Sequence, residues 1–275
     1  MWYKVNKRLI RVNWVEKQIY PAENWNNLNI STATLSKQFA TWYWFQWLYI
    51  NPDENVAMTA SFGSTWYVRW YTYSNKDIST SILEWTNTDT PQAHAVFANK
   101  TWTHIYVWLH WNISSSPHDW AIYEYNTSNF SVSSMSLYKT KSFSHNAQTI
   151  WIDVTETYLI VFWENTSSQK YIYLYQMTTP WDVSTATLVK SISAPFNCHW
   201  LFFNNEMTKC VACKYDASSW TVYQYDRDIL NSNSYTQTHS FWPVWFTIWY
   251  ANITKDGTKM YAARENWYIY QYSLT

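Results

Sequence analysis

The pair Tyr-x-Tyr recurs along this chain at a near-constant spacing of roughly fifty residues. Its copies are Tyr71/Tyr73, Tyr123/Tyr125, Tyr173/Tyr175, Tyr223/Tyr225 and Tyr270/Tyr272. A repeat of this length is one supersecondary unit, which buries its apolar faces only by packing against neighbouring copies. The chain is therefore predicted to fold as an array of similar units.

A second short motif accompanies the tyrosine pair. One copy lies before the first pair and one follows each of the first four pairs: Ile30-Ser31-Thr32, Ile78-Ser79-Thr80, Val132-Ser133-Ser134, Val183-Ser184-Thr185 and Leu230-Asn231-Ser232. The order of the motifs is therefore a circular permutation of the repeated unit.

Each unit is predicted to contain four short strands and no helix. In one unit, the expected strands are Trp200–Asn204, Lys209–Lys214, Thr221–Asp226 and Tyr235–Phe241, each bounded by Asn, Asp, Ser or Pro. Short strands that recur in groups of four are typical of propeller blades rather than of a sandwich. The predicted fold is an all-β, five-bladed β-propeller of four-stranded blades.

The ends of the repeat predict how the ring closes. The last unit stops at Thr275 after its third strand, and Ala33–Phe39 reads as an unpaired fourth strand near the start. Together they complete one blade, which removes exposed sheet edges. We therefore predict a propeller over residues 29–275 and an N-terminal appendage, residues 1–28, that caps the ring or attaches it elsewhere.

The charge and the apolar runs of the chain argue against a nucleic-acid partner and against membrane insertion. Lys and Arg number 19 and Asp and Glu number 19, so no basic groove for nucleic acid is expected. The first twenty residues mix charged and apolar side chains without an apolar core, and no apolar run is long enough to cross a bilayer. We expect no signal peptide, no membrane insertion and no nucleic-acid partner.

The chain has 2 Gly and 22 Trp, whereas about 19 Gly are expected at an average content of about 7%. Several Trp residues stand where a tight turn favours Gly, as in Asp119-Trp120, Ser219-Trp220 and Asn266-Trp267. Internal alignment also places Trp102 opposite Gly257.

These positions suggest that most Trp residues correspond to UGA codons in a source that reads UGA as Gly. Such a code resembles that of some uncultured bacterial lineages and their phages. Trp181 is expected to be a true Trp. The alternative is a genuinely Trp-rich surface.

Three segments resemble the propeller repeats of phage structural and tail-associated proteins: Ile269 to Thr275, Pro180 to Thr187 and Lys255 to Tyr261. The resemblance covers about residues 29–275, and related repeats also occur in bacterial surface proteins. Residues 3–21 likewise resemble the start of phage structural proteins. The resemblance implies a propeller located in a virion, with other virion structural proteins as partners.

No catalytic, metal or cofactor motif emerges from the sequence. There is no nucleophile elbow. The cysteines of Cys210-Val211-Ala212-Cys213 are expected on opposite faces of a strand, which argues against a metal or redox site. No cofactor is expected, and the cysteines, including Cys198, read as small apolar residues.

A propeller glycosidase would present paired carboxylates in the central channel. The predicted starts of the inner strands are instead Gln46, His94, Ile150, His199 and Val244, and Asp153 is an isolated acid nearby. The acids after the inner strands are expected to be solvated turn residues: Asp53, Glu54, Glu206 and Asp256.

Gln46, His94 and His199 are predicted to share one position at the mouth of the channel. They are candidate ligands for a sugar or an ion, or they satisfy backbone groups at the channel rim. The repeated tyrosines are expected to pack between blades, with each hydroxyl reaching an edge, rather than to bind sugars.

The sequence supports a non-enzymatic virion propeller, associated with a tail or fibre, that presents loops to a host-surface ligand such as a glycan. Two alternatives remain. One is a polysaccharide-degrading, glycosidase-like propeller, which needs converging acids. The other is a bacterial cell-surface or secreted propeller that serves as an interaction scaffold.

Overall fold

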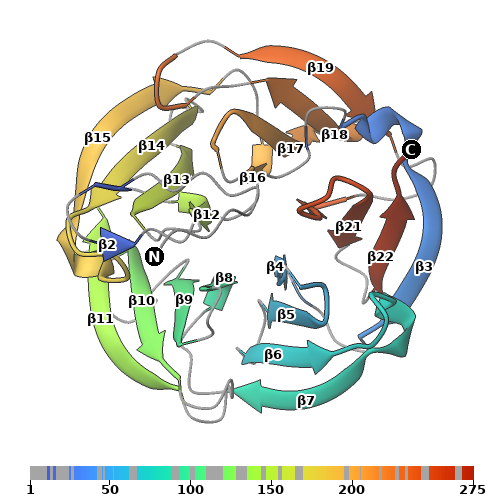
Figure 1. Ribbon diagram of the computed structural model, residues 1–275, viewed down its shortest axis with the longest axis horizontal. Helices are drawn as coiled ribbons and strands as arrows, with labels where there is room; N and C mark the ends of the chain where they lie inside the picture. Colours follow the sequence, from blue (N-terminus) through green and yellow to red (C-terminus); the bar gives the residue numbers. More distant parts are fainter. Residues whose placement is uncertain are drawn as a thin grey trace.

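In a computed structural model of the protein, five four-stranded antiparallel sheets form a ring, which confirms the predicted five-bladed β-propeller (Figure 1). The structure describes residues 11–12, 15–16, 25, 28–41, 45, 47–51, 53–61, 67–87, 93–99, 103–109, 120–127, 135–143, 147–153, 157–164, 170–194, 198–204, 206–216, 219–226, 229–232, 235–242, 248–263 and 268–275. A two-stranded hairpin, β1 (Arg11–Val12) and β2 (Val15–Glu16), precedes the ring.

Each blade runs from an inner strand near the ring axis to an outer strand at the rim (Figure 1). The first blade contains β4 (Trp47–Ile50), β5 (Val56–Ser61), β6 (Tyr67–Thr72) and β7 (Ile82–Asn87), and the second contains β8 (Ala93–Ala98), β9 (His104–Leu109), β10 (Trp120–Asn126) and β11 (Ser136–Phe143). The third contains β12 (Ala147–Ile152), β13 (Tyr158–Glu164), β14 (Lys170–Met177) and β15 (Ala186–Ser193), and the fourth contains β16 (Cys198–Phe203), β17 (Lys209–Asp216), β18 (Ser219–Asp226) and β19 (Thr236–Phe241).

The fifth blade is built from both ends of the repeat. Its first three strands are β20 (Tyr250–Ile253), β21 (Lys259–Ala263) and β22 (Tyr268–Ser273), and β3 (Thr34–Ala40) supplies the outer strand. Strand β3 pairs with β22 in antiparallel register from Ser273↔Thr34 to Tyr268↔Ala40. The predicted closure of the ring by a strand from the N-terminal side is confirmed.

The second tyrosines of the repeat pack between blades, as predicted: Tyr175 contacts Phe143 and Tyr272 contacts Phe241 of the preceding blade. Tyr125, Tyr175, Tyr225 and Tyr272 each lie opposite a β-bulge in the outer strand of their blade, and each is less than a tenth exposed. The hydroxyl of Tyr272 is buried as well, so the expectation that the hydroxyls reach an edge is wrong for this residue.

The predicted register is displaced in the first blade. There the bulge lies opposite Tyr71, so Tyr71 is equivalent to the second tyrosine of the other pairs, and Arg69 stands in place of the first. The middle residue of the motif in this blade is therefore Trp70 rather than Thr72.

Within the described residues, the second sequence motif forms a short 3-10 helix before the outer strand in three blades, and its copy Val132-Ser133-Ser134 lies outside the described residues. These are η1 (Ile30–Thr32), η2 (Ile78–Thr80) and η4 (Val183–Thr185). In each, the side chain of the preceding Asn or Asp accepts a hydrogen bond from the backbone N–H two residues later, as Asp77 does from Ser79 at 3.0 Å. We call these elements the seam helices, because they contact the preceding blade.

A buried side chain in the third strand of one blade binds the seam helix of the next. Gln271 in the fifth blade accepts a hydrogen bond of 3.1 Å from the N–H of Ile78. Gln224 in the fourth blade makes the equivalent contact to Ile30 at 3.3 Å. In the second blade, Glu124 accepts from Val183 at 3.0 Å. In these three blades, the middle residue of Tyr-x-Tyr therefore joins neighbouring blades.

The turn that follows each inner strand is also repeated. Asn204 Oδ1 accepts hydrogen bonds from the N–H groups of Thr208 and Lys209, at 2.8 and 2.9 Å. The backbone then passes through a left-handed residue, which is Met207 in the fourth blade and Gly257 in the fifth, with φ of 55° and 71°. The turns from Asn99 and Thr254 have the same register. Trp102, which the sequence aligns with Gly257, lies outside the described residues.

Both faces of each blade pack against neighbouring blades. In β17, Cys213 belongs to the core shared with the ring centre and Cys210 to a second cluster between the third and fourth blades. The two cysteines are buried on opposite faces of the strand, as predicted. Burial raises the pKa of the Cys213 thiol.

Candidate functional site

The predicted channel-mouth residues fall at the edge of what the structure describes. Gln46 lies outside the described residues. The backbones of His94 and His199 occupy equivalent bulges at the start of β8 and β16. Their side chains lie outside the described part, so the predicted convergence at the channel mouth stays a prediction.

The same bulge in the third blade contains Gln148, between Ala147 and Thr149. The expectation that Ile150 holds the equivalent position is wrong, because the strand register is displaced by two residues there. Val244, proposed for the fifth blade, lies outside the described residues, and the equivalent position next to Tyr250 is Trp249.

One residue beyond this bulge, aromatic rings meet at the centre of the ring. The ring centroids of Trp47 and Tyr250 are 5.1 Å apart, and those of Trp47 and Trp200 are 5.7 Å apart. These side chains come from the first, fifth and fourth blades, and each is 2% exposed. Side chains therefore fill the axis at this level.

Asp153, the isolated acid near the axis, has a structural role. Its Oδ1 accepts hydrogen bonds from the backbone N–H groups of Thr157 and Tyr158, at 2.7 and 2.6 Å. It occupies the turn position that Asn51 and Asn204 hold in other blades. Its carboxylate is thus equivalent to an amide oxygen elsewhere in the repeat.

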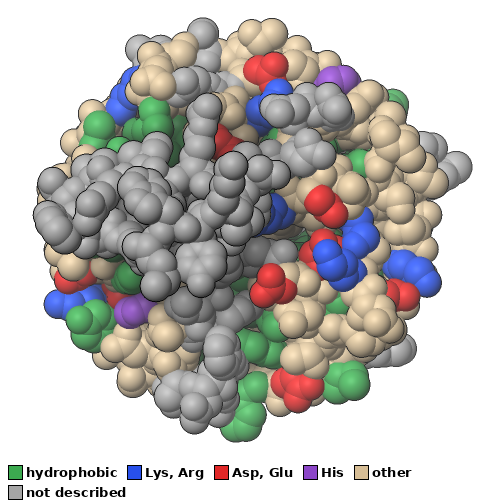
Figure 2. Space-filling model, viewed as in Figure 1, with side chains coloured by type: hydrophobic (Ala, Val, Ile, Leu, Met, Phe, Trp, Pro, Cys, Tyr) green, Lys and Arg blue, Asp and Glu red, His purple; other side chains and the backbone are tan. Residues whose placement is uncertain are grey.

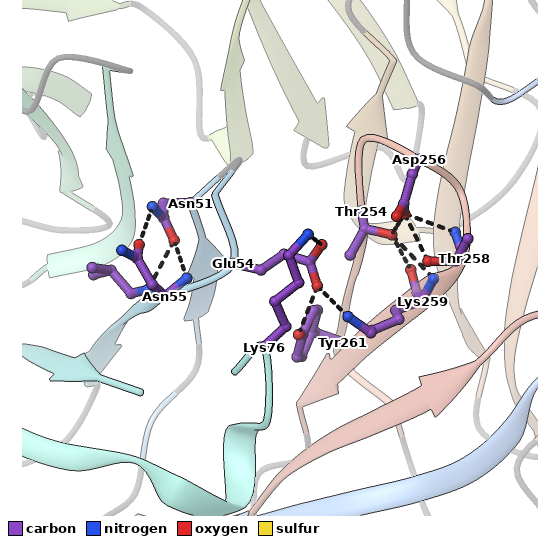
Figure 3. Close-up of polar contacts among 10 residues, drawn as sticks. Asn51, Glu54, Asn55, Lys76, Thr254, Asp256, Thr258, Lys259 and Tyr261 are labelled. Atoms are coloured by element: carbon purple, nitrogen blue, oxygen red, sulfur yellow. Dashed lines mark hydrogen bonds and ion pairs between the residues drawn. The ribbon is translucent and has the colours of Figure 1, made fainter. Parts of the chain in front are cut away.

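The expectation that Glu54 is a solvated turn acid is wrong. Its side chain is 4% exposed and lies between the first and fifth blades (Figure 3). It contacts Nζ of Lys259 at 2.7 Å and Nζ of Lys76 at 3.0 Å, and it accepts a hydrogen bond from the hydroxyl of Tyr261 at 3.2 Å. The lysine from the adjoining blade explains the burial, since a buried carboxylate needs a nearby opposite charge.

The other turn acids are exposed, as predicted. Asp53 and Glu206 are exposed, and Asp256 accepts hydrogen bonds from Thr254 and Thr258 (Figure 3). Acidic and basic side chains lie next to one another on the viewed face of the ring (Figure 2). Glu54 also contributes to raising the pKa of Tyr261, although burial is the larger cause.

A different set of side chains occupies the equivalent position between the second and third blades. His104 aligns with Lys259, and its Nδ1 lies 2.9 Å from Oε1 of Glu124. Glu124 is fully buried and aligns with Gln271, whereas His104 retains a side-chain exposure of 19%. This carboxylate–imidazole pair was not predicted from the sequence.

Two exposed aromatic rings lie beside this imidazole. The ring centroid of Trp181 is 6.3 Å from that of His104, and the ring centroid of Tyr138 is 6.2 Å from it. Trp181 is 39% exposed and Tyr138 is 51% exposed. We call His104, Glu124, Tyr138, Lys139, Trp181 and Asp182 the aromatic seam cluster.

No helix in the described part of the chain is long and apolar enough to cross a membrane. Within the same residues, no group of three or more His, Cys, Asp or Glu side chains is arranged to hold a metal ion.

No family model matches the chain, and no curated protein is similar to it. Among solved structures, the chain is similar to one described as the crystal structure of a functionally unknown protein from Desulfotomaculum acetoxidans DSM 771. The sequence identity is 14% and the TM-score is 0.49. The alignment covers 80% of this chain and spans 65% of the length of that protein.

Proposed function

We propose that this protein is a non-enzymatic propeller of a phage virion, associated with the tail or fibre, that presents loops to a host-surface glycan. The observation that carries the non-enzymatic part is the use of two acids near the axis: Asp153, the isolated acid weighed for catalysis, and Glu54, expected to be a solvated turn acid. Asp153 binds backbone N–H groups of its own turn, and Glu54 is held by two lysines and a tyrosine. A glycosidase needs such carboxylates to face a substrate.

The virion location rests on the resemblance of the repeats to those of phage structural proteins. The test is an adsorption assay in which purified protein competes with phage for host cells, combined with mass spectrometry of purified virions. We expect the protein among the virion components and a dose-dependent loss of adsorption. Hydrolysis of surface polysaccharide by the purified protein would instead support the glycosidase alternative.

We also propose that most Trp residues of this chain stand for glycines encoded by UGA. Trp108 and Trp200 support this, because each buries an indole N–H with no acceptor among the described residues, and native proteins rarely leave such a donor unpaired. Glycine at Trp47 and Trp200 removes two of the three rings that meet at the axis.

The codons decide this second proposal. We expect UGA at Trp102, Trp108 and Trp200, and a mass for the natural protein that matches Gly at those positions. UGG codons there overturn it. The turn conformation alone does not decide between Gly and Trp. Glu54 and Met207, at positions equivalent to Gly257, have the same left-handed conformation.

A further inference from the structure

The repeated blades provide an internal reference for unusual residues. Between the fifth and first blades, Gln271 binds the seam helix through a neutral amide. Between the fourth and fifth blades, Gln224 does the same. Between the second and third blades, Glu124 makes this contact to Val183 although a glutamine would serve equally well. A fully buried charge is costly, so its presence at this one position calls for a second role.

That second role is the contact with His104. One carboxylate oxygen of Glu124 accepts from the backbone of Val183, and the other lies 2.9 Å from Nδ1 of His104. Both atoms are buried and neither has a hydrogen-bond partner of good geometry among the described residues, so the contact is a close approach of the two groups. A carboxylate this near Nδ1 favours the proton on that nitrogen. This leaves Nε2 as the ring nitrogen that can accept a hydrogen bond from a ligand.

The residue beside the imidazole, Trp181, also differs from its equivalent in another blade. Trp181 is equivalent to Lys76, because each directly precedes the residue that caps a seam helix. Both residues have a left-handed backbone, with φ of 69° and 56°. Left-handed backbone is unfavourable for a bulky side chain. The fold nevertheless holds an indole there, partly exposed, where the first blade has a lysine.

We propose that the aromatic seam cluster is a binding subsite for a neutral pyranose unit, an inference that rests on the proposed glycan-binding function. The exposed rings of Trp181 and Tyr138 supply apolar faces for the C–H surface of a sugar. Nε2 of His104 accepts a hydrogen bond from a sugar hydroxyl. Glu124 is a positioning residue, because it acts through His104.

The charges of the cluster favour a neutral sugar over an acidic one. Nζ of Lys139 lies 3.5 Å from Oδ2 of Asp182 and 5.1 Å from the centroid of the Tyr138 ring. The ammonium group is therefore already paired, and Glu124 adds a second carboxylate. An anionic sugar would meet no unpaired cation among these residues, whereas hydroxyl groups find both donors and acceptors.

The test begins with a glycan array that contains neutral and acidic oligosaccharides, followed by calorimetric titration of a neutral oligosaccharide that binds. We expect Trp181→Ala to weaken its affinity by about fivefold or more, because stacking on a ring contributes on the order of 1 kcal/mol. Tyr268→Ala is the matched control, since Tyr268 is an aromatic residue 37% exposed on β22 of the fifth blade. It should leave the affinity unchanged.

The role of Glu124 is tested with Glu124→Gln, which restores the residue used between other blades. The thermal midpoint should be retained or rise, while sugar affinity falls and the NMR tautomer signals of His104 change. A variant that lowers stability without changing affinity or tautomer contradicts the positioning role. Tyr138→Ala provides a second affinity measurement if Trp181→Ala does not fold.

The outcomes separate this inference from the function on which it rests. No binding to any oligosaccharide overturns both. Binding that the Trp181 and Tyr138 variants leave unchanged overturns the subsite and leaves the glycan-binding function standing. Binding of acidic oligosaccharides alone overturns the assignment of a neutral sugar.

Discussion

Gln271 and Ile78 are 193 residues apart in the chain, yet the side-chain oxygen of one accepts a 3.1 Å hydrogen bond from the backbone N–H of the other. Both residues are buried. Gln271→Ala leaves this N–H without its acceptor and is expected to lower the free energy of unfolding by about 1–3 kcal/mol. Urea titration measures the change. Gln237→Ala, exposed on β19, is the control, and an equal loss in both variants would contradict the contact's role.

Glu54 links the first blade to the fifth, and its ion pairs are expected to stabilise the closed ring. Glu54→Gln removes the charge that Lys259 and Lys76 share and is expected to lower the free energy of unfolding by about 1–3 kcal/mol. Most of the loss is assigned to Lys259, since Lys76 is 53% exposed and exposed pairs contribute little. Calorimetric melting checks this against Asp53→Asn, a change to a neighbouring exposed acid. Equal midpoints for the two variants would disprove it.

Asp153 offers a prediction about charge. Asp153→Asn should change the free energy of unfolding by less than about 0.5 kcal/mol, as expected for a substitution that breaks no contact. The reason is that an asparagine oxygen makes the same turn contacts at Asn204. Asp153→Ala should cost about 0.5–2 kcal/mol, as the loss of a side-chain cap does. Chemical denaturation distinguishes the two. A polysaccharide hydrolysis that Asp153→Asn abolishes would show instead that the carboxylate is catalytic.

The buried tyrosines predict a loss of stability in alkali. Burial raises the pKa of Tyr71 and of Tyr175 to about 12, whereas an unfolded tyrosine has a pKa of about 10. The folded state therefore holds these protons more tightly. The stability that they contribute is complete below about pH 10 and falls as the pH rises toward 12.

Denaturation at a series of pH values, followed by tyrosinate absorbance, measures this effect. Tyr71→Phe should reduce the alkaline loss. A midpoint that does not change between neutral pH and pH about 11 would be incompatible with these pKa values.

The strands were predictable because their signals are local. The predicted Lys209–Lys214 and Thr221–Asp226 lie within β17 and β18, and alternating side chains with turn residues at each end suffice to find them. The register of the first blade was misjudged, since a Tyr-x-Tyr pair also arises two residues later, at Tyr71 and Tyr73.

The contacts between blades were not predictable from local pattern. Glu54 meets Lys259 across 205 residues, and a turn acid gives no sign of such a neighbour. A signal for the aromatic seam cluster did exist, because Glu124 stands where Gln224 and Gln271 stand in other copies of the motif. Comparing the copies for their differences, rather than their likeness, would have identified it.

The pairing of β3 with β22 means that the ring closes only at the end of folding. Ser36 and Gln271, which are hydrogen-bonded across this pair, are 235 residues apart. During synthesis, β3 leaves the ribosome early and has no partner until the other four blades have been made. Such distant pairing slows folding and leaves strand edges open to other chains in the meantime. The same strand that removes edges from the finished ring therefore makes the nascent chain vulnerable to aggregation until its last blade is translated.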